Sequence, residues 1–289
     1  MERPKVGGCR RGPEDHRDFR MAYGAAQLAR KVDLRPLCSR VENQARLNSC
    51  TANATVGAME ILERKQGMEQ VDLSRLFVYY NTRVLDGSVD KDVGSYISNA
   101  MRAVKAKGAC LESIWQYALG AVFALPSDAA YADGMNRQAV EYARVVQGAG
   151  VLQALNGGLP VVYGMMLRES FERTRGDGLV PVPAAGEPAT GGHAMLIVGY
   201  DLDERTYLVR NSWGEGWGDG GYCRIPFVMV DDSRMSWDFW VIYSMEDANG
   251  EVVRPDRGEQ HRQIEEWWNR LRRVAGRAVG RVAGWIRPK

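Results

Sequence analysis

The chain has 289 residues, of which 45% are hydrophobic and 26% charged, the balance of a soluble globular protein with one large domain or two lobes. Its net charge of +2 is too small to indicate a nucleic-acid partner, so none is expected. No run approaches the about 18 uninterrupted apolar residues that a membrane-spanning helix needs.

Residues 1–30 are charged and interrupted by glycine and proline, which predicts an arm on the body of the protein rather than a domain. They lack the apolar segment of a secretory signal. The five cysteines are scattered, without the spacing of metal ligands, and their odd number leaves one or more unpaired. We therefore expect a cytoplasmic protein, or one exported without a classical signal peptide.

The first half of the chain has helical periodicity. Apolar residues recur at steps of three and four after Cys50, which predicts a helix over 50–65. Two more helices are expected at 73–84 and 95–108, the last ending at a glycine cap. The segment 136–147 is compatible with either a helix or a strand.

After Gly148 the pattern changes to short runs of β-branched and aromatic residues separated by turn residues. Strands are predicted at 159–167, 193–201, 206–213 and 220–226. A long glycine- and proline-rich loop, 175–192, lies between the first two, and loops of this length often border a functional cleft. The chain thus consists of a helical half followed by a β half.

The C-terminal segment 251–289 has a different composition. Between 262 and 289 apolar residues recur at steps of three and four, and arginines dominate the flank, which predicts a basic amphipathic helix. Docking of this helix on the body is one interpretation. The alternative is peripheral contact with a membrane or a partner helix, favoured by tryptophans at both ends of the apolar stripe and glycines every four residues.

Cys50 stands at the expected start of a helix. The N-terminus of a helix offers unpaired N–H groups and a partial positive charge, which favour a thiolate. Packing is the commoner role of a free cysteine. The remaining chemistry of the chain decides between the two interpretations.

His193 is the one histidine of the three that opens an apolar strand, directly after the glycine-rich loop. The segment 210–222, RNSWGEGWGDGGY, follows it. Asn211 could bind one ring nitrogen of His193 and fix its tautomer, while Trp213 shields that bond from water. Imidazolium would stabilise a Cys50 thiolate, and the Gln44 amide with the Cys50 N–H could bind an oxyanion.

These motifs, in this order, resemble the papain-like (C1) cysteine peptidase family. Gln44 precedes Cys50 at the usual interval, Gly192-His193-Ala194 follows, and Asn211-Ser212-Trp213-Gly214 continues to Gly216-Trp217-Gly218. His193 lies within the roughly 130–150 residues downstream of the nucleophile that are usual for such enzymes. The match covers about residues 32–245, and compact prokaryotic members are the most similar.

The resemblance implies an α+β, two-lobed fold with a helical left lobe, an antiparallel β-barrel-like right lobe and the active site in the cleft between them. A peptidase domain would cover 31–250, with lobes at about 45–147 and 148–245. The arm, 1–30, is expected to lie near or over part of the cleft and to restrain access.

By the same resemblance Cys50, His193, Asn211 and Gln44 are catalytic. The residues expected to contact a peptide or protein substrate are Gly94, Ser95, Gly164, Met165, Ala194 and Trp213. Of these, Gly164, Met165 and Ala194 would lie near the pocket for the residue two before the scissile bond, where an apolar side chain is expected. No metal or organic cofactor is implied.

Three positions depart from the family pattern. Leu47 replaces the first cysteine of the motif around the nucleophile, so the usual neighbouring disulfide cannot form. Thr51 replaces an aromatic residue, and Gly192 stands where many members carry Asp or Asn.

Three functions fit the sequence: a cysteine peptidase acting through an acyl-enzyme, an amidase or transferase with the same triad, and a catalytically silent binding protein on the same scaffold. The intact set of Gln44, Cys50, His193 and Asn211 favours the peptidase.

Overall fold

The computed structural model of the protein describes residues 6–13, 15, 18–21, 27–65, 67, 71–246 and 252–253. The predicted helix at 262–289 lies outside these residues, as do His16 and His261. Its contact with a membrane or partner stays a prediction, which vesicle co-sedimentation of the full chain and of a chain ending at 252 can test.

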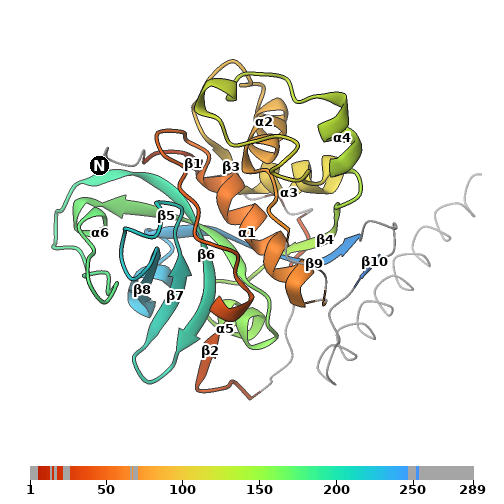
Figure 1. The fold of residues 1–289 in the computed structure, drawn as a ribbon. Coiled ribbons are helices and arrows are strands. Elements are labelled where there is room, and N and C mark those ends of the chain that lie inside the picture. The colour runs from red at the N-terminus through yellow and green to blue at the C-terminus, as the bar shows by residue number, and fades with distance from the viewer. Residues whose placement is uncertain are drawn as a thin grey trace, which may run out of the picture.

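Three helices make up the helical half of the molecule: α1 (Cys50–Lys65), α2 (Arg75–Asp86) and α3 (Ile97–Lys107). The side chain of Ser74 caps α2 by accepting a hydrogen bond from the Phe77 N–H, and Gly87 ends the helix in the left-handed conformation. The three helices correspond to those predicted from periodicity. α1 is buried along almost its whole length and lies between the sheet and the other helices (Figure 1).

The remaining helices are shorter. They are η1 (Arg35–Leu37), η2 (Leu119–Ala121), α4 (Asp128–Gly134), α5 (Ala149–Asn156), α6 (Glu169–Glu172) and α7 (Phe227–Val230).

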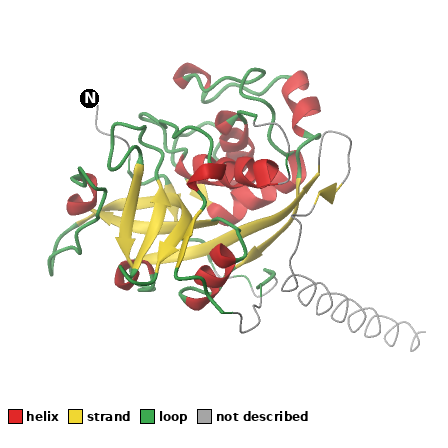
Figure 2. Ribbon diagram, turned by 60° about the horizontal axis from the view of Figure 1, so that its bottom comes forward, coloured by secondary structure: helices red, strands yellow, loops and turns green. Residues whose placement is uncertain are grey.

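An eight-stranded antiparallel sheet forms the other half (Figure 2). Its strands are β2 (Lys31–Asp33), β4 (Ala139–Arg144), β5 (Val161–Arg168), β6 (Ala189–Asp201), β7 (Thr206–Arg210), β8 (Tyr222–Pro226), β9 (Ser236–Glu246) and β10 (Val252–Val253). The main order is β10-β9-β5-β6-β7-β8, with β2 beside β6 and β4 beside β9. The fold is therefore α+β, as predicted.

Some boundaries differ from the sequence-based ones. The ambiguous segment 136–147 contains the strand β4, which pairs with β9 and so joins the large sheet. β6 starts four residues before His193, and β7 ends at Arg210, so Asn211 follows the strand. A second, two-stranded sheet pairs β1 (Cys9–Arg10) with β3 (Ser95–Tyr96) in parallel; nothing in the sequence indicated it.

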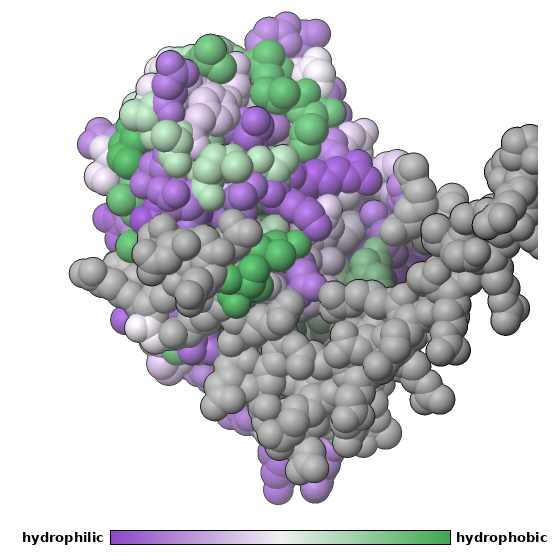
Figure 3. Space-filling view, turned by 90° about the vertical axis from the view of Figure 1, so that its right-hand side faces the viewer, coloured by the Kyte–Doolittle hydropathy of each residue, from purple (hydrophilic) through white to green (hydrophobic). Residues whose placement is uncertain are grey.

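Large exposed hydrophobic side chains, such as Phe123 and Leu125, are scattered over the helical half. The face in Figure 3 accordingly shows hydrophobic atoms interspersed with hydrophilic ones, which is ordinary for a water-exposed surface. None of the helices in the described residues is both long enough and apolar enough to cross a membrane.

Candidate active site

Cys50 is the first residue of α1 and is fully buried. Ser49 before it exchanges a 2.5 Å hydrogen bond with the Tyr117 hydroxyl and accepts another from the Asn53 amide at 3.0 Å. Burial raises the pKa of the Cys50 thiol to about 12, opposed by the N–H groups of Ala194, Thr51 and Cys50 itself. The sulfur thus lies at the helix N-terminus and beside the residue after His193.

His193 lies in β6, opposite Met165 of β5, and is also fully buried. Its Nε2 is 2.8 Å from Oδ1 of Asn211, which follows β7. Nδ1 has no hydrogen-bond partner among the described residues. Burial lowers the pKa of His193 to about 4, and the bond to Asn211 acts in the opposite direction. Asn211 therefore holds one ring nitrogen, and Nδ1 is the one available for proton exchange.

Aromatic rings cover the His193–Asn211 bond. The Trp213 ring lies 5.0 Å from the imidazole, centroid to centroid. Trp217 packs edge-on against Trp213 at 5.2 Å and stacks on Phe171, also at 5.2 Å. This cluster keeps water from the hydrogen bond that orients the imidazole.

Gln44 is tied to the segment that carries Asn211. Its main-chain N–H donates to the Ser212 carbonyl at 2.8 Å, and Gly214 donates in turn to the Glu42 carbonyl at 2.9 Å. The Ser212 hydroxyl donates to Gln44 Oε1 at 2.6 Å, and Gln44 Nε2 donates to the Leu47 carbonyl at 2.8 Å. The orientation of this buried amide is therefore fixed by both halves of the molecule.

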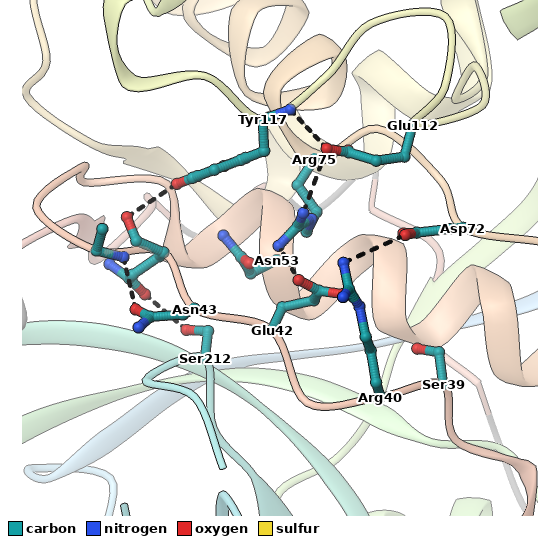
Figure 4. A network of polar contacts seen from close by, with 12 residues as sticks. Ser39, Arg40, Glu42, Asn43, Asn53, Asp72, Arg75, Glu112, Tyr117 and Ser212 are labelled. Atoms are coloured by element: carbon teal, nitrogen blue, oxygen red, sulfur yellow. Dashed lines mark hydrogen bonds and ion pairs between the residues drawn. The ribbon is translucent and has the colours of Figure 1, made fainter. Parts of the chain in front are cut away.

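Gln44 is supported from the helical side by Tyr117, which belongs to the polar network with Arg75, Glu42 and Glu112 shown in Figure 4. The Tyr117 hydroxyl donates to the Gln44 carbonyl at 3.0 Å, and the Tyr117 N–H donates to Glu112 at 2.5 Å. The buried Arg75 lies 4.6 Å below the Tyr117 ring and bridges Glu42 to Glu112. These charges are paired with one another, which is what burial of ionised groups requires.

Residues 6–10, called the arm strand below, pass through the space between the two halves. The Gly7 N–H donates to the Gly192 carbonyl at 3.1 Å, and the Ser95 N–H donates to the Gly8 carbonyl at 2.9 Å. A Cβ atom on Gly8 would lie 2.5 Å from the Asn48 carbonyl oxygen, and one on Gly94 would lie 2.1 Å from that of Gly8. Only glycines permit this approach of three backbones.

The arm strand is anchored beyond the cleft. Arg10 forms a 2.7 Å ion pair with the fully buried Asp86 and stacks 4.2 Å over the Tyr96 ring. Further along, the Gly12 N–H donates to Asp238 at 2.9 Å, and Asp18 binds Arg144 at 2.7 Å. The arm strand therefore contacts Gly94 and Ser95, two of the residues expected to meet substrate.

Two of the other expected substrate residues, Gly164 and Ala194, line the same space, whereas Met165, the next residue of β5, points to the opposite face of the strand. Gly164 pairs with Ala194 across β5 and β6, one step from Met165 and His193. A Cβ atom on Gly164 would lie 3.0 Å from the Cys9 sulfur. Trp213, in contrast, packs on the imidazole.

Burial affects the charges of the site. Because the pKa of Cys50 is raised to about 12 and that of His193 is lowered to about 4, the covered cleft favours a thiol and a neutral imidazole at neutral pH. The ion pair expected from the sequence is disfavoured because neither charge is hydrated. All five cysteines of the chain lie in described segments, and each is free and buried.

Four residues of the site were not predicted from the sequence: Cys9, Tyr117, Ser212 as a partner of Gln44, and Trp237. Tyr117 lies in an irregular loop, where no periodic pattern points to a contact. Trp237 could have been suspected from the SWDFW stretch at 236–240, which has three aromatic rings in five residues.

Comparison with known proteins agrees with this geometry. The model of the papain family cysteine proteases matches residues 28–232. A peptidase C1-like protein of Acanthamoeba polyphaga mimivirus is 34% identical over 236 residues, which are 78% of this chain and 76% of the relative. Ananain from Ananas comosus is 28% identical over 64% of this chain and 51% of its own.

Solved structures show the same likeness. Xylellain, a cysteine protease from Xylella fastidiosa, superposes with a TM-score of 0.78 at 32% identity, covering 86% of this chain and 98% of that one. Bromelain from Ananas comosus, in complex with the E64 inhibitor, has a TM-score of 0.58 at 20% identity, covering 74% and 98%, and supports the fold alone. The chain belongs to the papain family of cysteine proteases and is a papain-like cysteine peptidase.

Proposed function

We propose that the enzyme hydrolyses peptide bonds with Cys50 as nucleophile, His193 as general base and acid, and Asn211 as the residue that orients His193. The observation that carries this is the 2.8 Å bond between His193 Nε2 and Asn211, which leaves Nδ1 for the thiol. The position of Cys50 beside the Ala194 N–H supports the same roles.

In the first half-reaction the Cys50 proton passes to His193 Nδ1, and the sulfur attacks the peptide carbonyl carbon. The resulting oxyanion accepts hydrogen bonds from the Gln44 amide and the Cys50 N–H. His193 then donates its proton to the leaving amine nitrogen, and the C–N bond breaks. In the second, His193 takes a proton from water, whose oxygen attacks the thioester carbon. The C–S bond then breaks, His193 returns its proton to the sulfur, and the carboxylic acid and the thiol are released.

Substrate must replace the arm strand, because both use the backbone edge at Ser95 and the space beside Cys50. Release of the arm strand would hydrate the cleft and so favour the thiolate and imidazolium. We therefore assign the arm strand an inhibitory role, in addition to the catalytic role of Cys50.

The test is peptide cleavage by the full chain, compared with Cys50→Ala, together with mass-spectrometric mapping of iodoacetamide labelling. Cleavage lost in the variant, with Cys50 labelled faster than Cys110 and Cys223, is the expected result. Because the attached arm strand would slow both reactions, the same measurements are made on Arg10→Ala; a Cys50 no more reactive there than the other two, with no cleavage, would contradict the proposal.

A catalytically silent binding protein is the second candidate, favoured by the arm strand in the cleft and by the neutral pair of Cys50 and His193. It predicts slow labelling of Cys50 even after Arg10→Ala loosens the arm strand. An amidase or transferase would label Cys50 normally, but its products with added amines would contain the amine.

A further inference from the structure

The side chain of Cys9 lies against Gly164 next to Trp237, and the space that it fills is called the hollow below. Cys9 lies opposite Ser95, and its side chain is 4% exposed. Burial raises its pKa, as do the nearby Cys50 and Asp238, whereas the Trp237 N–H lowers it. Cys9 therefore lies near both the nucleophile and the Trp237 indole.

Trp237 closes the hollow opposite the arm strand. Cβ atoms added to Gly164 and Gly192 would lie 2.5 Å from its Nε1 and 3.3 Å from its Cζ2, so the ring edge spans both glycines. The ring is held there by close packing, since only 7% of Trp237 is exposed. A side chain on Gly164 would have to displace the ring, whereas one on Gly192 would first meet the Cys9 carbonyl oxygen at 2.1 Å.

A bulge in β9 directs Trp237 to this place. Gly164 and Val162 of β5 face Trp237 and Trp240 of β9, so β9 has one extra residue in this stretch. Within it Asp238 has a φ of 54°, and its carboxylate binds Arg144 at 2.5 Å and the Gly12 N–H at 2.9 Å. Bulges redirect side chains in this way beside active sites.

The indole also brings a hydrogen-bond donor. Nε1 of Trp237 is buried and has no regular acceptor among the described residues. Its neighbour is the Cys9 sulfur, a weak acceptor. A hydroxyl in the hollow would accept this N–H better than sulfur does.

We propose that Trp237 and Gly164 form a shallow subsite that selects peptides with a small side chain, above all serine or cysteine, two residues before the scissile bond. This rests on the proposed peptidase function and deepens it by naming a substrate class, which replaces the apolar side chain expected at this position from the resemblance. A leucine or phenylalanine side chain would need the volume that the indole fills. Cys9 of the arm strand occupies the subsite until substrate binds.

The first experiment measures kcat/KM for peptide amides that differ only at this position, with Ser, Ala, Leu or Phe. Ser and Ala should exceed Leu and Phe by about tenfold or more in the wild type, and Trp237→Ala should reverse that order. Preference for Leu or Phe by the wild type, or an unchanged order in Trp237→Ala, would overturn the proposal.

Two conservative variants separate the donor from the ring. Trp237→Phe keeps an aromatic ring but removes the N–H, so the preference for Ser over Ala should disappear. Trp240→Phe is the matched control: it lies on the same strand, packs on Tyr142, and also has an unpartnered buried N–H. It should keep the wild-type order, and melting temperatures should show that both variants fold. Equal effects of the two variants would contradict the role of Trp237.

A third experiment tests the size of the hollow by labelling Cys50, without measuring catalysis. Cys9→Leu should not fit beside Trp237, so it should displace the arm strand and speed iodoacetamide labelling of Cys50 about fivefold or more. In Trp237→Ala the same change should give no gain, because leucine then fits. A wild-type labelling rate for Cys9→Leu with Trp237 intact would refute the proposed size limit.

The outcomes separate the two proposals. If Cys50 is reactive and peptides are cleaved, but kcat/KM does not depend on side-chain size, the subsite is refuted and the peptidase function is not. An inert Cys50 with no cleavage in the wild type and in every variant would refute both.

Discussion

The two walls of the cleft are stabilised by different interactions. The wall that carries Cys50 is polar: Gln44 is held by hydrogen bonds from Ser212 and Tyr117, and a buried Arg75 with its carboxylates lies behind them. The wall that carries His193 is aromatic, with Trp213 and its neighbours over the imidazole. One wall supplies donors, and the other excludes water.

The difference fits what each reacting group needs in the mechanism that we propose. A sulfur and an oxyanion become more negative during the reaction and require fixed N–H groups nearby. An imidazole requires a defined tautomer and a single orientation, which one hydrogen bond in a dry environment provides. The effects of mutations in the two walls should therefore differ in magnitude and in the kinetic constant that changes.

The largest effects are expected at the reacting atoms, one on each wall. Cys50→Ser and His193→Ala should each lower kcat/KM by about 10³-fold or more, because each removes a group that forms or breaks bonds. Steady-state hydrolysis of a peptide amide measures this. Substantial activity of His193→Ala would mean that another group carries the proton.

Asn211→Ala should cost less, about a hundredfold in kcat, because the imidazole remains but loses its fixed orientation. Asn211→Gln, which restores an amide, should not restore full activity because the acceptor is displaced by one methylene. A loss equal to that of His193→Ala would show that Asn211 does more than orient the ring.

On the polar wall, Tyr117→Phe should lower kcat about tenfold with little change in KM, less than the about 10²–10³-fold cost of losing an oxyanion donor outright. The hydroxyl does not touch the reacting atoms but fixes the Gln44 main chain. Tyr131→Phe is the matched control, since its hydroxyl donates to Asn81 at 3.1 Å away from the cleft. Equal losses in both variants would indicate general destabilisation.

The smallest effect concerns the arm strand between the walls. Arg10→Ala should raise the rate of Cys50 alkylation about two- to fivefold, because the ion pair between the partly exposed Arg10 and the buried Asp86 carboxylate is lost. Hydration should lower the Cys50 pKa from about 12 and raise the His193 pKa from about 4, so alkylation should begin at a lower pH.

The pH dependence of alkylation by iodoacetamide measures this change. Arg30→Ala, which removes a solvent-exposed pair with Asp203, is the control and should leave the profile unchanged. An identical profile for Arg10→Ala would mean that Arg10 does not hold the arm strand over Cys50.

The sequence predicted the parts of the molecule that have strong periodicity or a dense motif. The three long helices and the strands β5 to β8 follow from patterns that depend on neighbouring residues. The long strand β9 was not predicted, and the proximity of Cys50 to His193 was inferred from the family resemblance. The contact of Tyr117 with Gln44 joins two irregular segments 73 positions apart, which no local pattern specifies. The inward turn of Trp237 depends on a bulge, and a bulge changes the alternation from which strand faces are predicted.

Asp238 links the attachment of the arm strand to the position of Trp237 in the subsite. Its backbone makes the bulge that aims Trp237, while its carboxylate binds the Gly12 N–H. The free energies of arm attachment and indole placement are then coupled, and coupling is reciprocal. If attachment of the arm strand raises the equilibrium constant for the inward position of the indole by some factor, the inward indole raises the equilibrium constant for arm attachment by the same factor.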